Sequence, residues 1–234
     1  MAKVKFGGMV ADARGKHNGA VFSRSRFGAL ARAKVSPVQP RGHASSVVRS
    51  RLTGLSKRWA TNLTVAQRAA WNGFAEQTPI RDVYGNSQRL SGIGAYQRVN
   101  GILLAAGQSR LDSPPTDLTV DYLTQLTGTF DVGFGDDMSV SWAPDPLPSD
   151  TGLYIFASAP MSPGRTFAKS FLRFLDASDD QATSPYDIKT KYTARFGTPP
   201  VGRVIHLHVA LVKLTTGAVS SGVSVAITVI STEE

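Results

Sequence analysis

The chain has no cysteine among its 234 residues. Disulfide bonds, thiolate zinc sites, iron–sulfur clusters and cysteine nucleophiles are therefore all excluded. Histidine is scarce as well, with four residues, which argues against a histidine-rich metal site. No apolar run approaches the roughly 20 residues that a membrane-spanning helix needs, and the first 19 residues lack the apolar core of a secretory signal. We therefore expect a soluble protein made in a reducing cytoplasm, with no membrane partner.

Acidic residues are almost missing from the first quarter of the chain. Residues 1–60 hold 13 Lys and Arg but only one acidic residue, Asp12, which gives a net charge of +12. Residues 61–110 carry +3, whereas residues 111–234 carry −6, with 14 acidic residues against eight basic ones. Such a charge difference between the two ends is typical of a basic arm that contacts something anionic.

Residues 1–42 are predicted to form an extended basic arm. The segment GKHNG at 15–19 indicates a turn, and the following residues 20–34 favour an open hairpin or an extended ribbon. Phe22 and Phe27 fall on opposite faces of such a strand, so this part has no single apolar face and cannot build a core alone. The two prolines of SPVQPRG then favour extended geometry over 36–42.

Residues 43–113 change to helical periodicity and are predicted to form a helical docking region. The first helix, over 44–61, carries one apolar stripe, and its basic residues lie off that stripe. The stripe is Val48, Leu52, Leu55 and Trp59, and the basic residues include Arg49 and Arg51. Thr64 and Gln67 have capping-box spacing for a second helix, and Ser91 suits the start of a third. Three short helices give a thin core, so we expect help from a partner chain.

Residues 114–234 are predicted to form an antiparallel β-sandwich. Past the proline-rich boundary DSPPTDLT the period changes to two, and short β-like runs alternate with turn signals. The runs that we expect to be strands are residues 138–142, 153–159, 167–175, 203–214 and 222–230.

Two resemblances follow from these segments. The run SVSWAPDPLPSDTGLYIFAS, followed by VGRVIHLHVALVKLTTGAVSSGVSVAITV, resembles a fibronectin type III or immunoglobulin-like module over residues 115–232. The Trp142 strand, the TTG turn after the long strand and the last strand carry this likeness. A tyrosine expected at the corner of the penultimate strand is missing from VIHLHVALV, which leaves the topology open.

The N-terminal half resembles uncharacterised structural proteins of tailed bacteriophages and prophages. The pieces, in this order, are GKHNGAVFSRSRFGALARAKVSPVQPR, LTGLSKRWATNLTVAQRAAWNGFA and SGIGAYQRVNGILLAAG. The likeness covers about 110 residues of the chain. It implies a virion structural protein, located in the particle after synthesis in a bacterial cytoplasm.

The chain offers no convincing catalytic constellation. His206 and His208 share one face of a strand, but no third metal ligand is signalled nearby, and the polar face of an alternating strand explains them better. The carboxylate pairs Asp136–Asp137 and Asp179–Asp180 are typical of turn tips. Neither a phosphate-binding GxxxxGK[ST] loop nor a GxSxG nucleophile motif is present. We therefore expect no enzyme, no metal, no cofactor and no small-molecule substrate.

The sequence thus predicts an α+β protein with an extended basic N-terminal arm, a small three-helix region and a C-terminal immunoglobulin- or fibronectin III-like sandwich. Its expected function is that of a capsid-, neck- or tail-associated accessory or decoration protein of a tailed phage. Expected partners are other virion proteins and further copies of itself. The alternative is a nonspecific nucleic-acid-binding protein with an immunoglobulin-like interaction module. The residues expected to contact partners are Phe22, Arg24, Arg26, Phe27, Arg32, Lys34, Arg49, Arg51 and Trp59.

Overall fold

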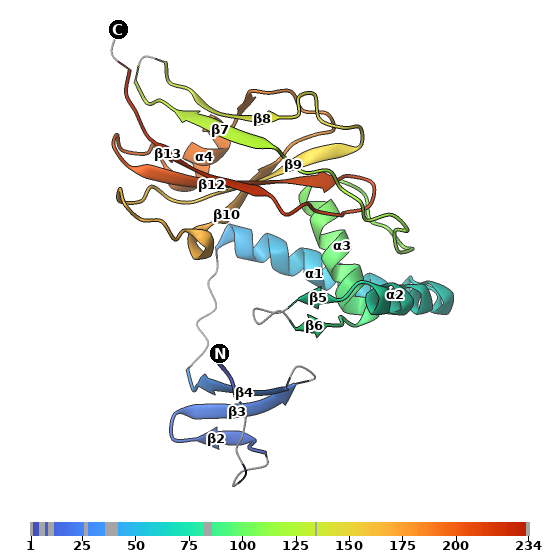
Figure 1. Ribbon diagram of the computed structural model, residues 1–234. Helices are drawn as coiled ribbons and strands as arrows, with labels where there is room; N and C mark the ends of the chain where they lie inside the picture. Colours follow the sequence, from blue (N-terminus) through green and yellow to red (C-terminus); the bar gives the residue numbers. More distant parts are fainter. Residues whose placement is uncertain are drawn as a thin grey trace.

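The structure is a computed structural model that describes residues 2–4, 8, 12–25, 28–35, 42–81, 86–133 and 135–232. The described residues contain four α-helices and several antiparallel sheets, which confirms the α+β class (Figure 1). Along the chain, a small N-terminal sheet comes first, a group of three helices follows, and two larger sheets with the fourth helix complete the fold.

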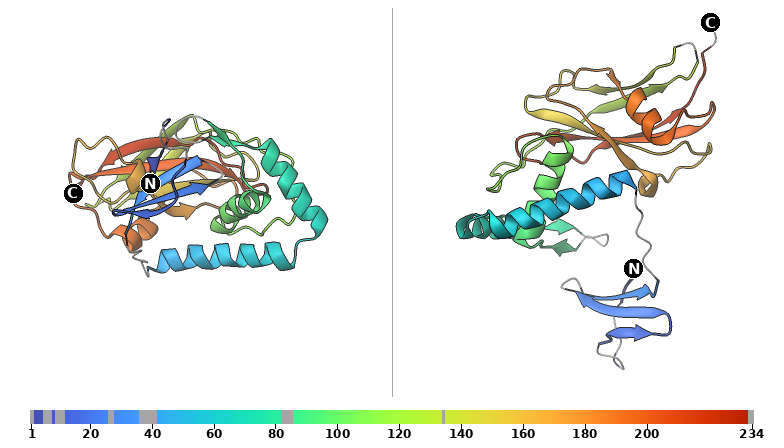
Figure 2. Two further views of the ribbon diagram at one scale, coloured as in Figure 1. Left: turned by 90° about the horizontal axis from the view of Figure 1, so that it is seen from below. Right: turned by 180° about the vertical axis from the view of Figure 1, so that it is seen from behind.

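The N-terminal sheet has four antiparallel strands in the order β1-β4-β3-β2. They are β1 (Ala2–Lys3), β2 (Gly15–His17), β3 (Ala20–Ser25) and β4 (Gly28–Ala33). The predicted turn at 15–19 is present, because Asn18 and Gly19 take positive φ angles of 38° and 78° between β2 and β3. The hairpin that the sequence allowed is β3–β4, and β1 and β2 widen it to four strands. This sheet lies apart from the rest of the molecule (Figures 1 and 2).

The three helices of the middle region are α1 (His43–Thr61), α2 (Val65–Gln77) and α3 (Gly92–Ala105). The capping box before α2 is present, since Thr64 and Gln67 each bond the other's backbone N–H. Ser91 caps α3 by accepting a hydrogen bond from the Gly94 N–H. A short antiparallel pair, β5 (Ile80–Arg81) and β6 (Ser87–Gln88), lies between α2 and α3.

One apolar core holds these helices together. Tyr96 and Trp71 are fully buried, and their rings meet edge to face with centroids 5.4 Å apart. Leu55 from α1 and Leu103 from α3 are buried in the same core. The predicted stripe on α1 therefore packs inward over its C-terminal half.

The remaining residues form two antiparallel sheets that pack against each other. One sheet has the order β11-β8-β7 and the other β10-β9-β12-β13. Their strands are β7 (Gln125–Phe130), β8 (Met138–Ala143), β9 (Thr151–Ala157), β10 (Arg173–Ala177), β11 (Tyr186–Asp187), β12 (Val204–Lys213) and β13 (Val223–Thr228). Both sheets supply buried side chains to a single core, with Trp142 on one side and Leu207 on the other.

The expected strands at 138–142, 153–159, 203–214 and 222–230 correspond to β8, β9, β12 and β13. The expected strand at 167–175 is wrong in its first half, because η1 (Lys169–Phe171), a 3₁₀ turn, precedes β10. The strands β7 and β11 and the helix α4 (Lys189–Phe196) were not expected from the sequence. The α4 side chain Tyr192 is fully buried against Phe130.

The helical region packs on the outer face of the four-stranded sheet. Tyr154 on β9 donates a hydrogen bond from its hydroxyl to the Ile102 carbonyl of α3, at 3.1 Å. Burial raises the pKa of Tyr154 to about 12, so the hydroxyl stays a donor at every physiological pH. Gly217, in the loop between β12 and β13, comes so close that an added Cβ would lie 3.0 Å from the Val99 carbonyl oxygen. Figure 2 shows α3 running into this joint from the other helices.

Candidate docking surface

The faces of the N-terminal sheet mix apolar and cationic side chains. The register places Phe22 opposite Ala31 on β4 and Val21 opposite Arg32. Because residues directly opposite share a face and neighbours along a strand alternate, Phe22 and Arg32 lie on opposite faces. Val21 is also opposite Lys16 on β2, so it is flanked by two cations. The other face carries Phe22 among the alanines of β3 and β4, with Arg24 near its end. The expectation that Phe22 and Phe27 lie on opposite faces stays untested, because Phe27 lies outside the described residues.

The sheet contains cations that no carboxylate neutralises. Asp12 lies 3.2 Å from the Arg14 guanidinium and 3.5 Å from that of Arg24. Three further side chains are exposed and have no acidic partner among the described residues, namely Lys16, Arg32 and Lys34. The described part of this sheet therefore presents net positive charge to solvent.

The helix α1 is packed at one end and open at the other. Leu55 is buried and Trp59 is half-buried, with its ring 5.6 Å from that of Tyr96. Val48 and Leu52, on the same stripe nearer the N-terminus, are 54% and 43% exposed. The N-terminal half of α1 therefore keeps an apolar stripe that nothing covers among the described residues.

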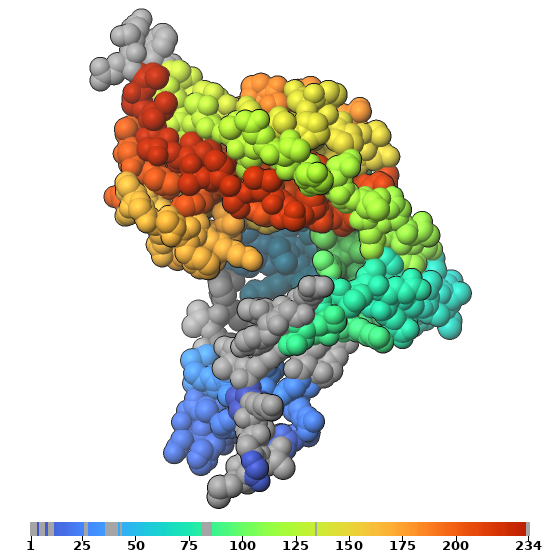
Figure 3. Space-filling model, in the orientation of Figure 1, coloured from blue at the N-terminus to red at the C-terminus, as the bar shows by residue number. Residues whose placement is uncertain are grey.

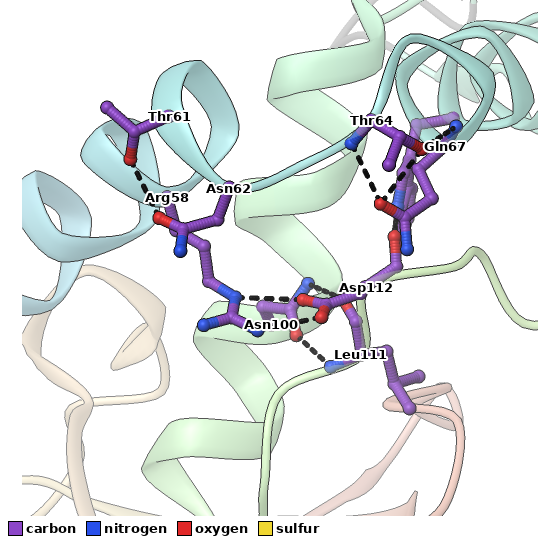
Figure 4. Close-up of polar contacts among 9 residues, drawn as sticks. Arg58, Thr61, Asn62, Thr64, Gln67, Asn100, Leu111 and Asp112 are labelled. Atoms are coloured by element: carbon purple, nitrogen blue, oxygen red, sulfur yellow. Dashed lines mark hydrogen bonds and ion pairs between the residues drawn. The ribbon is translucent and has the colours of Figure 1, made fainter.

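Polar contacts with the segment after α3 hold α1 in place (Figure 4). Arg58 donates two hydrogen bonds to the Asp112 carboxylate, from Nε at 2.8 Å and from Nη2 at 2.7 Å. These bonds from the guanidinium hold the pKa of Asp112 below its usual value. The Asp112 carbonyl accepts a hydrogen bond from the indole of Trp71 on α2, at 2.8 Å. One residue thus connects two helices and fixes the direction of α1.

Asn100 on α3 supports the same corner from inside. Its side chain is fully buried, accepts a hydrogen bond from the Leu111 N–H at 2.7 Å and donates to the carbonyls of Tyr96 and Leu111. The NH₂ group of the amide therefore donates two hydrogen bonds, and its oxygen accepts one. The arrangement orders the chain that leads from α3 to the two large sheets.

The predicted contact residues fall into three groups. Arg24, Arg32, Lys34 and Arg49 are exposed, and Phe22 and Arg51 are half-exposed, so these six can contact a partner. Trp59 instead packs within the helical core. Arg26 and Phe27 lie outside the described residues. The exposed stripe of α1 was missed as a contact surface, although its spacing was recognised.

The other candidates from the sequence lie at the surface. The carboxylate pairs Asp136–Asp137 and Asp179–Asp180 occupy turns, and His206 and His208 lie on the outward face of β12. Asp136 forms an ion pair with Lys189, and Asp137 accepts a hydrogen bond from the Ser139 hydroxyl. Asp180 accepts a hydrogen bond from the Thr151 N–H at 3.0 Å, across two neighbouring turns. Within the described ranges, no three His, Asp or Glu side chains gather as a metal site would require. Nor does any helix in these ranges have the length and apolarity to cross a bilayer.

Comparison with known proteins gives no family for this chain. No protein-family model matches it. No curated protein matches it significantly.

Proposed function

We propose that the chain is a structural protein of a tailed bacteriophage virion, of the accessory or decoration kind associated with the capsid, neck or tail. It docks to the particle through its basic N-terminal sheet and the open part of α1. The observation that carries this proposal is the small N-terminal sheet, which is rich in unpaired cations, has no fully buried side chain among the described residues of β2, β3 and β4, and lies apart from the rest of the molecule.

The N-terminal sheet gains little stability from its own packing. Its four strands are short, one face carries Val21 between two cations, and the other carries Phe22 among small alanine side chains. Binding to an acidic surface would cover Val21 and would bring Lys16 and Arg32, which share its face, against opposite charge. The remainder of the chain has three apolar cores of its own among the described residues.

The proposal includes an immunoglobulin- or fibronectin III-like fold for the two large sheets. Three strands in the order β11-β8-β7 face four in the order β10-β9-β12-β13. The chain crosses between the sheets from β8 to β9, from β10 to β11 and from β11 to β12, which supports a Greek-key arrangement. Sandwiches of this kind serve many roles. The fold therefore suits a docking protein but does not specify its partner.

Copies of the chain are proposed as partners of one another, because opposite charges lie at two places in it. Asp145 accepts a hydrogen bond from the Ser184 N–H, and Asp180 accepts one from Thr151, so the turns after β8 and β10 lie together. Four exposed aspartates of these turns have no ion pair among the described residues: Asp145, Asp150, Asp179 and Asp180. The basic sheet of one copy would complement this acidic end of the next.

The direct test is whether the chain is part of a particle. Particles are purified by density gradient from the phage or lysogen that encodes the chain, and the chain is sought in them by mass spectrometry. We expect a fixed stoichiometry to the major capsid protein, and loss of the chain from particles when residues 1–42 are deleted. If the chain is abundant in the lysate but absent from the purified particles, the proposal is overturned.

Nonspecific nucleic-acid binding is the second candidate, and the unpaired Lys16, Arg32 and Lys34 are the observation that favours it. Binding of the full chain to a random 30-base-pair duplex is measured across a salt series. A steep fall of log affinity with log salt would favour this function. Weak binding at all salt concentrations would leave the protein-docking function.

A further inference from the structure

A groove lies on the outer face of the four-stranded sheet, the same face on which α3 packs, and Phe156 contributes both to the groove and to the apolar cluster at the α3 joint. Its volume is about 640 Å³, and its floor is formed by β9, β12 and β13. The segment 162–172, which contains η1, forms its wall. Figure 3 shows the surface hollowed beside this segment, below β12 and β13.

The wall is held to the sheet at defined points. The Ser162 hydroxyl accepts a hydrogen bond from Arg203 at 2.9 Å, and the Arg165 carbonyl lies 3.0 Å from the His206 Nε2. The Arg165 guanidinium stacks over the Phe171 ring at 4.3 Å from its centroid. The groove is therefore built by specific contacts.

The lining of the groove combines apolar side chains with polar ones. Phe156, Phe167 and Leu172 supply apolar surface, and Lys169 supplies a charge. Phe167 is 66% exposed at the edge, and Phe171 on the same segment is 40% exposed. Exposed aromatic side chains around a groove are typical of a protein interface, because a partner would remove their surface from water.

The groove carries positive charge at neutral pH. Lys169 is the only lysine or arginine of the lining, and no Asp or Glu belongs to the lining among the described residues. Burial, together with the nearby Lys169 ammonium, lowers the pKa of His208 below its ordinary value, so its imidazole is neutral. The His208 Nδ1 lies 2.9 Å from the Ser224 hydroxyl, which fixes the ring against β13.

We propose that this groove binds an extended peptide segment of a partner protein, with an aromatic or aliphatic side chain seated between Phe156 and Phe167 and an adjacent Asp or Glu facing Lys169. The aromatic rings of Phe156 and Phe167 supply affinity, and the lysine selects an acidic neighbour. No lining residue of this site belongs to the N-terminal sheet or to α1, so the site does not depend on the function proposed for them.

The test begins with a library of random heptapeptides displayed on a carrier and selected on the full chain. We expect enriched peptides to contain an apolar residue next to Asp or Glu. The best peptide is synthesised with a fluorescent label, and its Kd is measured by anisotropy. Phe167→Ala, at an exposed position, should weaken binding by about fivefold, and Lys169→Glu should weaken it by about tenfold or more.

Two controls make the result decisive. Lys57→Glu changes an exposed lysine of α1 outside the groove, and Arg32→Ala changes the N-terminal sheet; both should leave the Kd unchanged. The proposal is overturned if no peptide is enriched, if the enriched peptides lack acidic residues, or if Lys169→Glu binds as tightly as the parent. It is also overturned if the groove takes up free 4-phenylbutyrate and no peptide, since the site would then be a small-molecule site.

Discussion

The guanidinium of Arg58 on α1 forms a two-pronged ion pair with Asp112, 54 residues further along the chain. The planar fork matches the carboxylate, so both bonds have good geometry. The pair therefore connects α1, the candidate docking helix, with the segment that leads into the two large sheets.

Asp112→Asn should lower the melting temperature by about 2–4 °C. The amide keeps the shape but loses the charge, and the pair is partly exposed, so the effect is modest. The folded-state pKa of Asp112 is lowered, so its contribution is present above the ordinary value of 3.8 and is lost as the pH falls through the lowered value. Thermal unfolding of parent and variant at neutral and acid pH checks both statements. Equal melting-temperature differences at pH 7 and pH 2 would contradict the role of the charge.

Replacing the buried Asn100 by Leu should cost about 1–3 kcal/mol of the free energy of unfolding. The leucine fills a similar space but leaves the Leu111 N–H and two carbonyls without their partner. Urea unfolding measures the change, and Asn62→Leu, at an exposed position after α1, is the matched control. An Asn100 variant as stable as the parent would show that the amide network contributes little.

Much of the fold follows from the periodicity of the sequence. The strand β12 was predicted because Ile205, Leu207 and Val209 alternate with histidines that face outward, and the structure buries these three side chains. The capping box of α2 was equally clear, because Thr64 and Gln67, which bond each other's backbone, lie only three positions apart in the sequence. Local signals of this kind do not depend on what lies far along the chain.

Other elements depend on contacts that a single segment cannot reveal. In β7 the inward positions are Leu126, Gly128 and Phe130, and the glycine interrupts the apolar alternation. An added Cβ at Gly128 would lie 2.4 Å from the Ile227 side chain, so the close approach of β13 explains the glycine. The helix α4 is short and mostly polar, and only the spacing of Tyr192 and Phe196 signals it.

The candidate site was predicted only in part, for a related reason. The stripe from Val48 to Trp59 was found from its spacing, but spacing does not say how far the neighbouring helix extends. Because α3 covers only the C-terminal half of α1, Trp59 is a core residue and Val48 is exposed. The groove under the segment 162–172 was not predicted, since its lining comes from strands and a loop that are distant in sequence.

Gly217→Ala should loosen the joint between the helices and the four-stranded sheet. Gly217 has a positive φ of 68°, and its Cβ would meet the Val99 carbonyl at 3.0 Å and Leu103 at 3.2 Å. Gly164 has a positive φ of 85° but nothing within 4 Å, so Gly164→Ala carries the backbone strain alone, about 1–2 kcal/mol. We expect the Gly217 variant to lose more stability than the Gly164 variant in urea unfolding. Equal losses would mean that the joint adjusts freely.

The proposed contact between copies leads to a charge-swap experiment. One variant carries Lys16→Glu, Arg32→Glu and Lys34→Glu in the N-terminal sheet. The other carries Asp145→Lys and Asp179→Lys in the acidic turns. All five side chains are exposed, so the folds should be kept.

At low salt the parent should self-associate, and each variant alone should do so less, because like charges now meet. An equal mixture of the two variants should regain association, since the acidic sheet of one variant complements the basic turns of the other. Analytical ultracentrifugation at two salt concentrations measures this, with Lys57→Glu as the control that should behave as the parent. Restoration in the mixture would tie association to these two surfaces, because a variant that had merely misfolded could not be rescued by its partner. A parent chain that stays monomeric at every concentration, or a mixture that fails to associate, would contradict contact between copies and leave other virion proteins as the proposed partners of the basic sheet.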